Sequence, residues 1–307
     1  MSHAHSSGPA SIMVYTSAGV ELRTPALQRA RRLLTALGFE VELDPSVRLR
    51  HQRFAGTDNE RLATLHRVAD AAPSIAMACR GGYGMTRLLD VVDWKRVARS
   101  VSKGTRWVGY SDMTALQMGR LAHKGAPSWA GPMACDDFGR ADGEGGVDDI
   151  TRDCFVEAMT GALRAVGFRT EAGFDGLHAK GVLWGGNLAM LCSMLGTPHF
   201  PRVKGGILFV EDVNEHPYRV ERCLLQLHQA GVLGAQKAVL LGAVSDYRAS
   251  PLDRGYTLKS AVACLRAVSR TPLLTGLPFG HVRIKVSFPL GQRVELAVQD
   301  RDVLVGW

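Results

Sequence analysis

Long hydrophobic runs are missing from this sequence. No stretch approaches the ~18 consecutive apolar residues that a membrane-spanning helix requires. The first ten residues, MSHAHSSGPA, have neither the basic start nor the apolar centre of a secretory signal. We therefore expect a cytoplasmic protein with no membrane partner.

Paired metal ligands are also missing. No C-x-x-C pair, short-range Cys/His cluster or H-E-x-x-H pattern occurs, which excludes the common zinc sites and a disulfide framework. We expect no metal and no cofactor. The six cysteines are predicted to be reduced, buried thiols: Cys79, Cys135, Cys154, Cys192, Cys223 and Cys264.

Nucleic-acid-binding motifs are absent although the formal net charge is +8 and the pI is near 9.4. The basic residues, such as Arg23, Arg29 and Arg53, are spread along polar helix faces instead of forming one block. We expect no nucleic-acid partner, and an acidic small substrate suits the charge equally well.

The first half of the chain alternates between strand and helix signals. An apolar run at 11–16 precedes apolar residues at helical spacing over 24–37, and Thr57 and Glu60 have capping-box spacing at the start of the next helix. Further strands are expected at 74–79 and 106–110, the latter leading into a helix over 112–122. This order predicts an α/β, flavodoxin-like, doubly wound parallel sheet whose ligands bind at the C-terminal ends of its strands.

The second half is richer in strand signals. Strands are expected at 206–211 and 238–244 and in the alternating segment 282–288, with one helix from Pro217 to Gly231. This predicts a β-rich α+β domain. The acidic, glycine-rich segment DDFGRADGEGGVDD indicates a linker or mobile loop. The expected division is a disordered N-terminus at 1–10, an N-terminal domain at 11–135, a linker with a bridging helix at 136–165, and a C-terminal domain at 166–307.

The sequence GYSD places Ser111 at an expected strand-to-helix junction. Such a turn exposes a serine hydroxyl as in a nucleophile elbow, although Met113 occupies the place of the last glycine of G-x-S-x-G. The alternative is that Ser111 or Asp112 caps the helix.

A second motif, RGGYG at 80–84, follows an expected strand. Its glycines would let backbone N–H groups approach a phosphate or an oxyanion, with a plain turn as the alternative. It is not a dinucleotide fingerprint, because Arg87 stands where the third glycine belongs.

An acid and a histidine complete the candidates. Glu211 ends an apolar run, with Glu215 and His216 nearby as competitors, and His281 follows Gly280 at the start of an alternating segment. A histidine at such a position is more often a plain surface residue.

Taken together, these stretches resemble the serine LD-carboxypeptidase family, which comprises the muramoyl-tetrapeptide carboxypeptidases and their microcin-immunity relatives. The resemblance spans the whole chain. It is carried, in order, by SIMVYTSAG, FAGTDNERLATLH, RGGYGMTRLL, GYSDMTAL, LWGGNLAML with GTP, ILFVEDVNEHPYRVERCLLQL and LPFGH.

The resemblance implies that Ser111 is the nucleophile, Glu211 the acid and His281 the general base. It also implies an oxyanion hole made by the backbone N–H groups at Gly82 and Asp112. A carboxypeptidase needs a pocket for the terminal carboxylate of its substrate; Arg80, with Gly81 beside it, is the candidate, and a structural ion pair is the alternative for Arg80.

The implied function is release of terminal D-alanine from a murein tetrapeptide during cell-wall peptide recycling, by a homodimer. The alternatives are a microcin-immunity-type hydrolase that cleaves an aminoacyl-nucleotide analogue and a non-catalytic anion-binding module. The sequence does not distinguish lysine from diaminopimelate in the substrate. One departure from the family is Ala130, where relatives often have a histidine before Gly-Pro.

Overall fold

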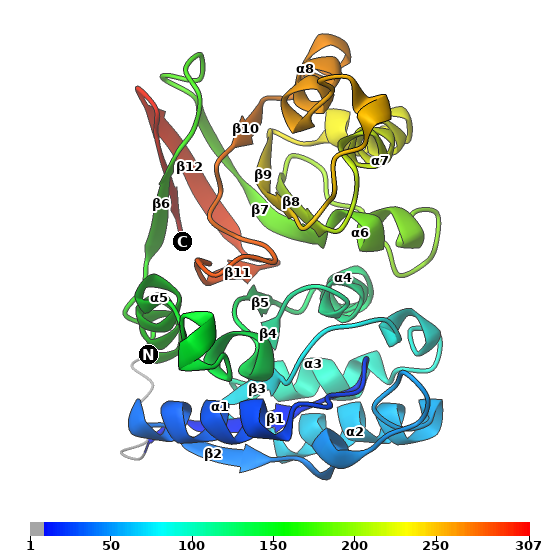
Figure 1. The fold of residues 1–307 in the computed structure, drawn as a ribbon, viewed down its shortest axis with the longest axis vertical. Helices are drawn as coiled ribbons and strands as arrows, with labels where there is room; N and C mark the ends of the chain where they lie inside the picture. The colour runs from blue at the N-terminus through cyan, green and yellow to red at the C-terminus, as the bar shows by residue number, and fades with distance from the viewer. Residues whose placement is uncertain (1–8) are drawn as a thin grey trace.

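The computed structural model describes residues 9–307, which form two sheets, each accompanied by helices (Figure 1). Most of the N-terminal segment expected to be disordered lies outside the described residues. No helix among residues 9–307 combines the length and apolar character needed to cross a membrane.

The first sheet has six strands in the order β11-β5-β4-β3-β1-β2. All neighbours pair in parallel except β11, which pairs antiparallel with β5 at the edge. The strands are β1 (Ser11–Tyr15), β2 (Glu40–Leu43), β3 (Ile75–Ala78), β4 (Arg106–Gly109), β5 (Ser128–Ala130) and β11 (Phe288–Leu290).

Helices cover both faces of this sheet, which confirms the doubly wound prediction for the first half of the chain. Alternate side chains of β1 explain it: Ile12 and Val14 join one apolar cluster with α1 and α5, whereas Met13 and Tyr15 join another with α2, α3 and α4. The helices are α1 (Thr24–Ala36), α2 (Asp58–Ala71), α3 (Trp94–Ser102), α4 (Met113–Lys124) and α5 (Asp149–Thr160). The Thr57–Glu60 capping box is present at the start of α2.

The second sheet has seven strands in the order β10-β9-β8-β7-β12-β13-β6. Its β7-to-β10 part is parallel and lies beside α6, α7 and α8, whereas β12, β13 and β6 extend it antiparallel (Figure 1). The elements are β6 (Ala165–Arg169), β7 (His178–Asn187), α6 (Leu188–Met194), β8 (Ile207–Val213), α7 (Pro217–Gln229), β9 (Ala238–Ser245), α8 (Leu258–Val268), β10 (Leu273–Thr275), β12 (Arg293–Gln299) and β13 (Asp302–Gly306).

Single helical turns complete the architecture. They are η1 (Pro45–Arg48), η2 (Met85–Arg87), η3 (Ala134–Phe138), η4 (Asp142–Glu144), η5 (Leu233–Ala235) and η6 (Pro251–Asp253). The turn η3 has π geometry, and the others are 3₁₀ turns.

The acidic segment 136–149 differs from the expectation of a mobile loop. Its first residues belong to η3, where Asp137 and Phe138 are buried. Asp137 pairs with the buried Lys285, which lies 148 positions further along the chain. Composition suggested mobility because the acids seemed free to stay in water, but a distant lysine neutralises one of them.

The expected alternating strand at 282–288 also differs. Residues 281–287 form no strand, and Lys285, Val286 and Ser287 are all buried, because this segment passes between the two sheets. Its end becomes β11, which joins the first sheet. The second half of the chain thus contributes an edge strand to the N-terminal sheet.

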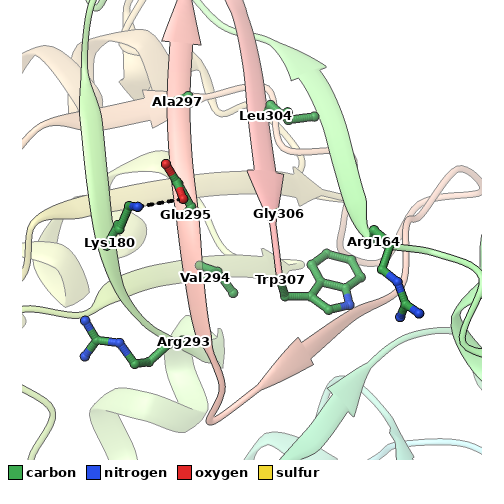
Figure 2. Close-up of a pocket in the computed structure, with 9 residues that line it drawn as sticks. All are labelled: Arg164, Lys180, Arg293, Val294, Glu295, Ala297, Leu304, Gly306 and Trp307. Carbon is green, nitrogen blue, oxygen red and sulfur yellow. Dashed lines mark ion pairs between the residues drawn. The ribbon is translucent and has the colours of Figure 1, made fainter.

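One face of the antiparallel extension is open to solvent (Figure 2). Leu304 is 54% exposed there, and Lys180 and Glu295 form an ion pair of 2.9 Å across neighbouring strands. Trp307 lines the lower end of the same shallow hollow.

Candidate active site

Ser111 lies in the tight connection between β4 and α4. Its φ is +63°, a left-handed conformation that non-glycine residues seldom adopt. Neither Ser111 nor Asp112 caps α4 with its side chain, so the helix-cap interpretation is wrong. A strained residue at the C-terminal end of a parallel strand is typical of a functional position.

The glycine loop of residues 80–84 packs directly against Ser111. A Cβ placed on Gly81 would lie 2.7 Å from both the Cβ and the Oγ of Ser111, closer than real Cβ contacts. The carbonyl of Gly81 accepts a hydrogen bond of 3.1 Å from the N–H of Gly19. A side chain at position 81 would therefore displace either the loop or the serine.

Gly81→Ala is expected to lower kcat by about a hundredfold or more, the size of losing one oxyanion donor. The backbone of Gly81 has no left-handed φ, so alanine acts through its contact with Ser111 rather than through backbone strain. Steady-state kinetics measure the effect. The matched control is Gly234→Ala, whose added methyl group meets no atom within 4 Å. Equal activity of the two variants would contradict the expectation.

Two backbone donors lie at this junction without acceptors. Within residues 9–307 neither the N–H of Gly82 nor that of Asp112 donates a hydrogen bond. Gly82 has φ +82°, and a Cβ there would approach the Cα of Gly19 to 3.2 Å, so glycine suits the position. Unpaired N–H groups beside a serine are the groups that an oxyanion hole needs.

His281 and Glu211 come from the second half of the chain and meet at the same place. His281 Nδ1 donates to Glu211 Oε2 at 2.8 Å, and Glu211 is buried. Gly280 has φ +135°, and a Cβ there would lie 3.2 Å from Glu211 Oε2. Glycine at this position therefore allows the backbone before His281 to lie close to the carboxylate of Glu211.

The competitor acid is engaged elsewhere. Glu215 forms an ion pair with Arg219, one turn along the chain at the start of α7. Its neighbour His216 stacks on Tyr218. Neither contacts His281 within the described residues, so the geometry favours Glu211 as the partner of the imidazole.

The environment of His281 changes its pKa in two opposing ways. Burial alone lowers the pKa, but the hydrogen bond and negative charge of Glu211 outweigh burial and raise the pKa above its usual 6.5. The bond through Nδ1 also fixes the tautomer, so Nε2 is free to accept a proton.

Tyr110 connects the histidine to the serine. The ring of His281 packs edge to face on Tyr110 with centroids 4.9 Å apart, and Tyr110 directly precedes Ser111. Ser111 Oγ and the His281 ring form no hydrogen bond in residues 9–307 as they stand. Catalytic hydrogen bonds are often long in unliganded enzymes.

A buried ion pair that the sequence did not predict packs beside His281 and Tyr110. Lys285 Nζ contacts Asp137, donates to the carbonyl of Val282 at 2.7 Å, and lies 4.9 Å from the centre of the Tyr110 ring. It ties the segment after His281 to η3. No local signal could have identified the pair, because its members are far apart in sequence.

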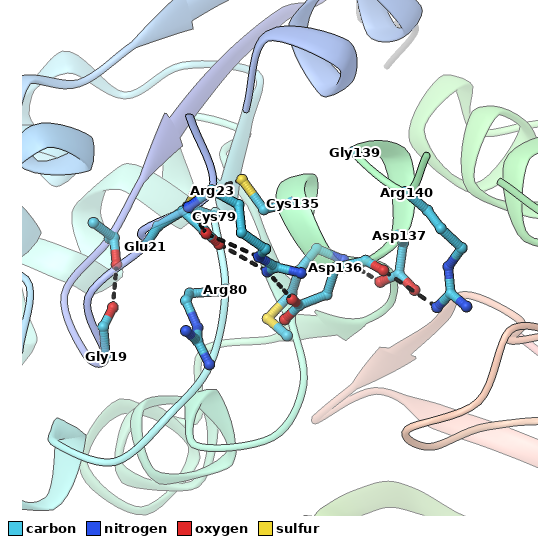
Figure 3. Close-up of polar contacts among 12 residues, drawn as sticks. Gly19, Glu21, Arg23, Cys79, Arg80, Cys135, Asp136, Asp137, Gly139 and Arg140 are labelled. Carbon is cyan, nitrogen blue, oxygen red and sulfur yellow. Dashed lines mark hydrogen bonds and ion pairs between the residues drawn. The ribbon is translucent and has the colours of Figure 1, made fainter. Parts of the chain in front are cut away.

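Arg80 is the first residue of the glycine loop, and its side chain is drawn in Figure 3. Its Nη1 donates to the carbonyl of Val20 at 3.0 Å, and its Nε is buried without an acceptor in the described part of the chain. It forms no direct ion pair with any residue of 9–307, although its positive charge contributes to lowering the pKa of Glu21.

Glu21, Cys79 and Cys135 could bring three metal-ligand atoms within 4.8 Å of one another (Figure 3). The donor set does not suit a cation, because Arg23 already donates to both oxygens of Glu21 and neutralises its charge. The two thiols contact each other at 3.1 Å, and burial and the neighbouring thiol raise the pKa of Cys79. This cluster is therefore a packed polar contact.

The chain is similar to known proteins along most of its length. Residues 12–131 match the family model of the LD-carboxypeptidase N-terminal domain, and residues 180–296 match that of the C-terminal domain. The murein tetrapeptide carboxypeptidase of Pseudomonas aeruginosa is 30% identical over 282 residues, which cover 90% of this chain and 89% of that protein.

Solved structures give the same result. The muramoyltetrapeptide carboxypeptidase from Oxalobacter formigenes superimposes with a TM-score of 0.86 and 39% identity, covering 96% of this chain and 97% of that one. The microcin C7 self-immunity protein has a TM-score of 0.84, covering 98% of both chains, but at 20% identity it shows only that the fold is shared.

Proposed function

Because the chain belongs to the LD-carboxypeptidase family, we propose that this serine carboxypeptidase releases the terminal D-alanine of a murein tetrapeptide. Two observations carry the proposal: the buried Glu211 is hydrogen-bonded to the half-buried His281, and Ser111 has a strained backbone beside unpaired backbone N–H groups. The named relatives that act on murein peptides support the substrate. We propose a role in cell-wall peptide recycling in the cytoplasm, a location that the six free cysteines support.

The proposed mechanism assigns one task to each group. His281 accepts the proton of Ser111 as the hydroxyl attacks the carbonyl carbon before D-alanine, and Glu211 stabilises the imidazolium. The N–H groups of Gly82 and Asp112 donate to the oxyanion. His281 then gives its proton to the departing amine, and water repeats the sequence to release the tripeptide.

The terminal carboxylate of the substrate needs a cation, and we assign this task to Arg80 with Gly81 beside it. The position of Arg80 at the start of the glycine loop supports the assignment, since only its Nη1 is shown to donate within the described residues, to the carbonyl of Val20. A bidentate arginine–carboxylate contact would select substrates with a free C-terminus over longer peptides.

The direct experiment offers the protein three compounds in parallel: a murein tetrapeptide ending in D-alanine, the same peptide ending in L-alanine, and an aminoacyl-nucleotide analogue. Mass spectrometry should detect free alanine from the first peptide only, which shows that the enzyme requires the D configuration at the terminal residue. Cleavage of the nucleotide analogue alone would favour the microcin-immunity alternative, and cleavage of none would favour an anion-binding module. Tetrapeptides with lysine and with diaminopimelate determine the diamino-acid preference.

The acidic limb of the pH profile is expected to lie above pH 6.5. His281 serves as a base only when neutral, and Glu211 raises its pKa, so kcat/KM should rise as the pH passes through that raised value. Removing the negative charge in Glu211→Gln should move the limb to lower pH. A limb that does not move would show that another group controls it.

We also propose a homodimer, with the open face of β12 and β13 as its interface. Exposed Leu304 is flanked by charges of both signs, including the pairs Lys180–Glu295 and Arg169–Asp302, which favours a second copy over a partner of one charge. Leu304→Lys should shift the mass measured by light scattering from dimer to monomer. A wild-type monomer, or a variant that stays dimeric, would contradict the proposal.

A further inference from the structure

The peptide unit between Gly84 and Met85 is held from both sides by buried charged side chains. Arg61 Nη1 donates to the carbonyl of Gly84 at 2.8 Å. Asp112 Oδ2 accepts from the N–H of Met85 at 2.7 Å. Arg61 is fully buried and Asp112 is 4% exposed, so water does not compete for either bond.

Arg61 is itself fixed in place by several contacts. It donates to the carbonyl of Ser17 at 3.0 Å, pairs with Asp58, and lies over the ring of Phe54 at 4.7 Å. Gly84 has φ +149°, and a Cβ there would lie 2.7 Å from Arg61 Nη1, so the guanidinium reaches the carbonyl only because residue 84 is glycine.

Asp112 would be expected to cap α4, because aspartate at a helix start usually does. Its side chain instead turns to the glycine loop and leaves the helix uncapped. Burial raises the pKa of Asp112 to about 6, so the fold keeps an ionisable group in an unfavourable place. Helix capping therefore does not explain why a buried carboxylate occupies position 112.

The loop is thus fixed at two points, and the oxyanion donor adjoins the first of them, because the Gly82 N–H and the Gly81 carbonyl belong to one planar peptide. At one end the N–H of Gly19 holds the carbonyl of Gly81, and at the other end Arg61 and Asp112 hold the Gly84–Met85 peptide. Only Gly82 and Tyr83 lie between these points. Gly19 therefore holds the peptide plane that contains the Gly82 N–H, and Arg61 and Asp112 limit the rotation of that plane from the other end of the loop.

We propose that Asp112 and Arg61 are positioning residues whose side chains aim the Gly82 N–H at the oxyanion formed on attack by Ser111. The inference rests on the proposed function, because it assumes acyl transfer at Ser111. It gives Asp112 two tasks: its backbone N–H donates to the oxyanion, and its carboxylate orients the other donor.

The test compares Asp112→Asn with Asp44→Asn. Asp44 is likewise buried and accepts from a backbone N–H, that of Ser46, and from Arg67, but it does not contact residues 80–85. Asp112→Asn keeps the shape and the backbone donor while it replaces the charged acceptor of the Met85 N–H with a neutral amide. Its kcat on the tetrapeptide should fall about tenfold to a hundredfold, with KM changed less than about threefold. Asp44→Asn should lower Tm but keep wild-type kcat.

A second readout does not depend on the natural substrate. A fluorophosphonate labels Ser111 through an oxyanion-like transition state, so its labelling rate should fall in Asp112→Asn in parallel with kcat. If the wild-type protein is labelled but releases no D-alanine, the proposed substrate fails while labelling still tests the loop. Wild-type kcat and labelling in Asp112→Asn, or equal losses in Asp44→Asn, would overturn the inference.

Arg61→Lys carries the test if Asp112→Asn does not fold. Lysine keeps the charge but has a single nitrogen, so it cannot both bind the carbonyls of Ser17 and Gly84, as Nη1 does, and pair with Asp58, as Nη2 does. It should slow labelling of Ser111 by about tenfold with little change in KM. A folded Arg61→Lys variant that is labelled at the wild-type rate would also overturn the inference.

Discussion

Ser111→Ala is expected to reduce turnover of the tetrapeptide by roughly a millionfold, as when a serine-protease nucleophile is removed. Without the hydroxyl no acyl-enzyme can form, and the oxyanion donors contribute only a small residual rate. The Ser111 hydroxyl forms no hydrogen bond within residues 9–307, so the Tm should stay close to that of the wild type. Release of D-alanine and thermal unfolding, measured on the same preparation, check both parts.

His281→Ala should lose as much activity, because nucleophile and base act as one unit. It should also lower Tm, since the buried carboxylate of Glu211 would lose its hydrogen-bond partner and already has one oxygen without a donor in the described residues. Ser111→Ala therefore separates the loss of activity from a loss of stability better than His281→Ala does.

Wild-type turnover in Ser111→Ala would refute a serine peptidase mechanism altogether.

Glu211→Gln is expected to lower kcat by roughly ten-thousandfold, the effect of the equivalent change in the serine-protease triad. The amide keeps the size of the side chain but removes the negative charge that stabilises the imidazolium of His281. It also allows the opposite tautomer, in which Nε2 carries the proton and cannot accept one from Ser111. Because a neutral amide is easier to bury than a carboxylate, Tm should not fall substantially.

Glu215→Gln is the matched control for Glu211→Gln. Glu215 is four residues away along the chain and pairs with Arg219 instead of His281, so its loss should leave kcat near the wild-type value. If Glu215→Gln were inactive and Glu211→Gln active, the wrong acid would have been assigned to the histidine.

Local features explain which parts of the fold could be predicted from sequence. The strand at 11–16, the helix over 24–37 and the capping box at Thr57 and Glu60 were predicted and are present as β1, α1 and the start of α2. Each depends on residues a few positions apart, where spacing and side-chain type suffice. The shorter helices α3, α6 and α8 were not predicted, because weak local patterns became helices through packing.

For the candidate site too, the sequence identified the residues and the structure placed them relative to one another. Motif order and family resemblance selected Ser111, Glu211 and His281, and the structure places the acid and the histidine in a hydrogen bond. Whether these three residues perform catalysis stays a prediction for the variants above.

The sequence by itself determined the main elements of the N-terminal half (β1, α1, α2, β3, β4 and α4), the family, and the residue types available for chemistry, because these follow from local spacing and motif order. Only the tertiary structure decided that Asp137 of the acidic segment pairs with Lys285, that β11 joins the first sheet, and that the Asp112 side chain leaves its helix for Met85. Burial and the choice of a hydrogen-bond partner depend on residues that folding brings together from distant parts of the chain. No local pattern specifies them, because a carboxylate followed by a helix looks the same in sequence whether it caps that helix or holds a loop.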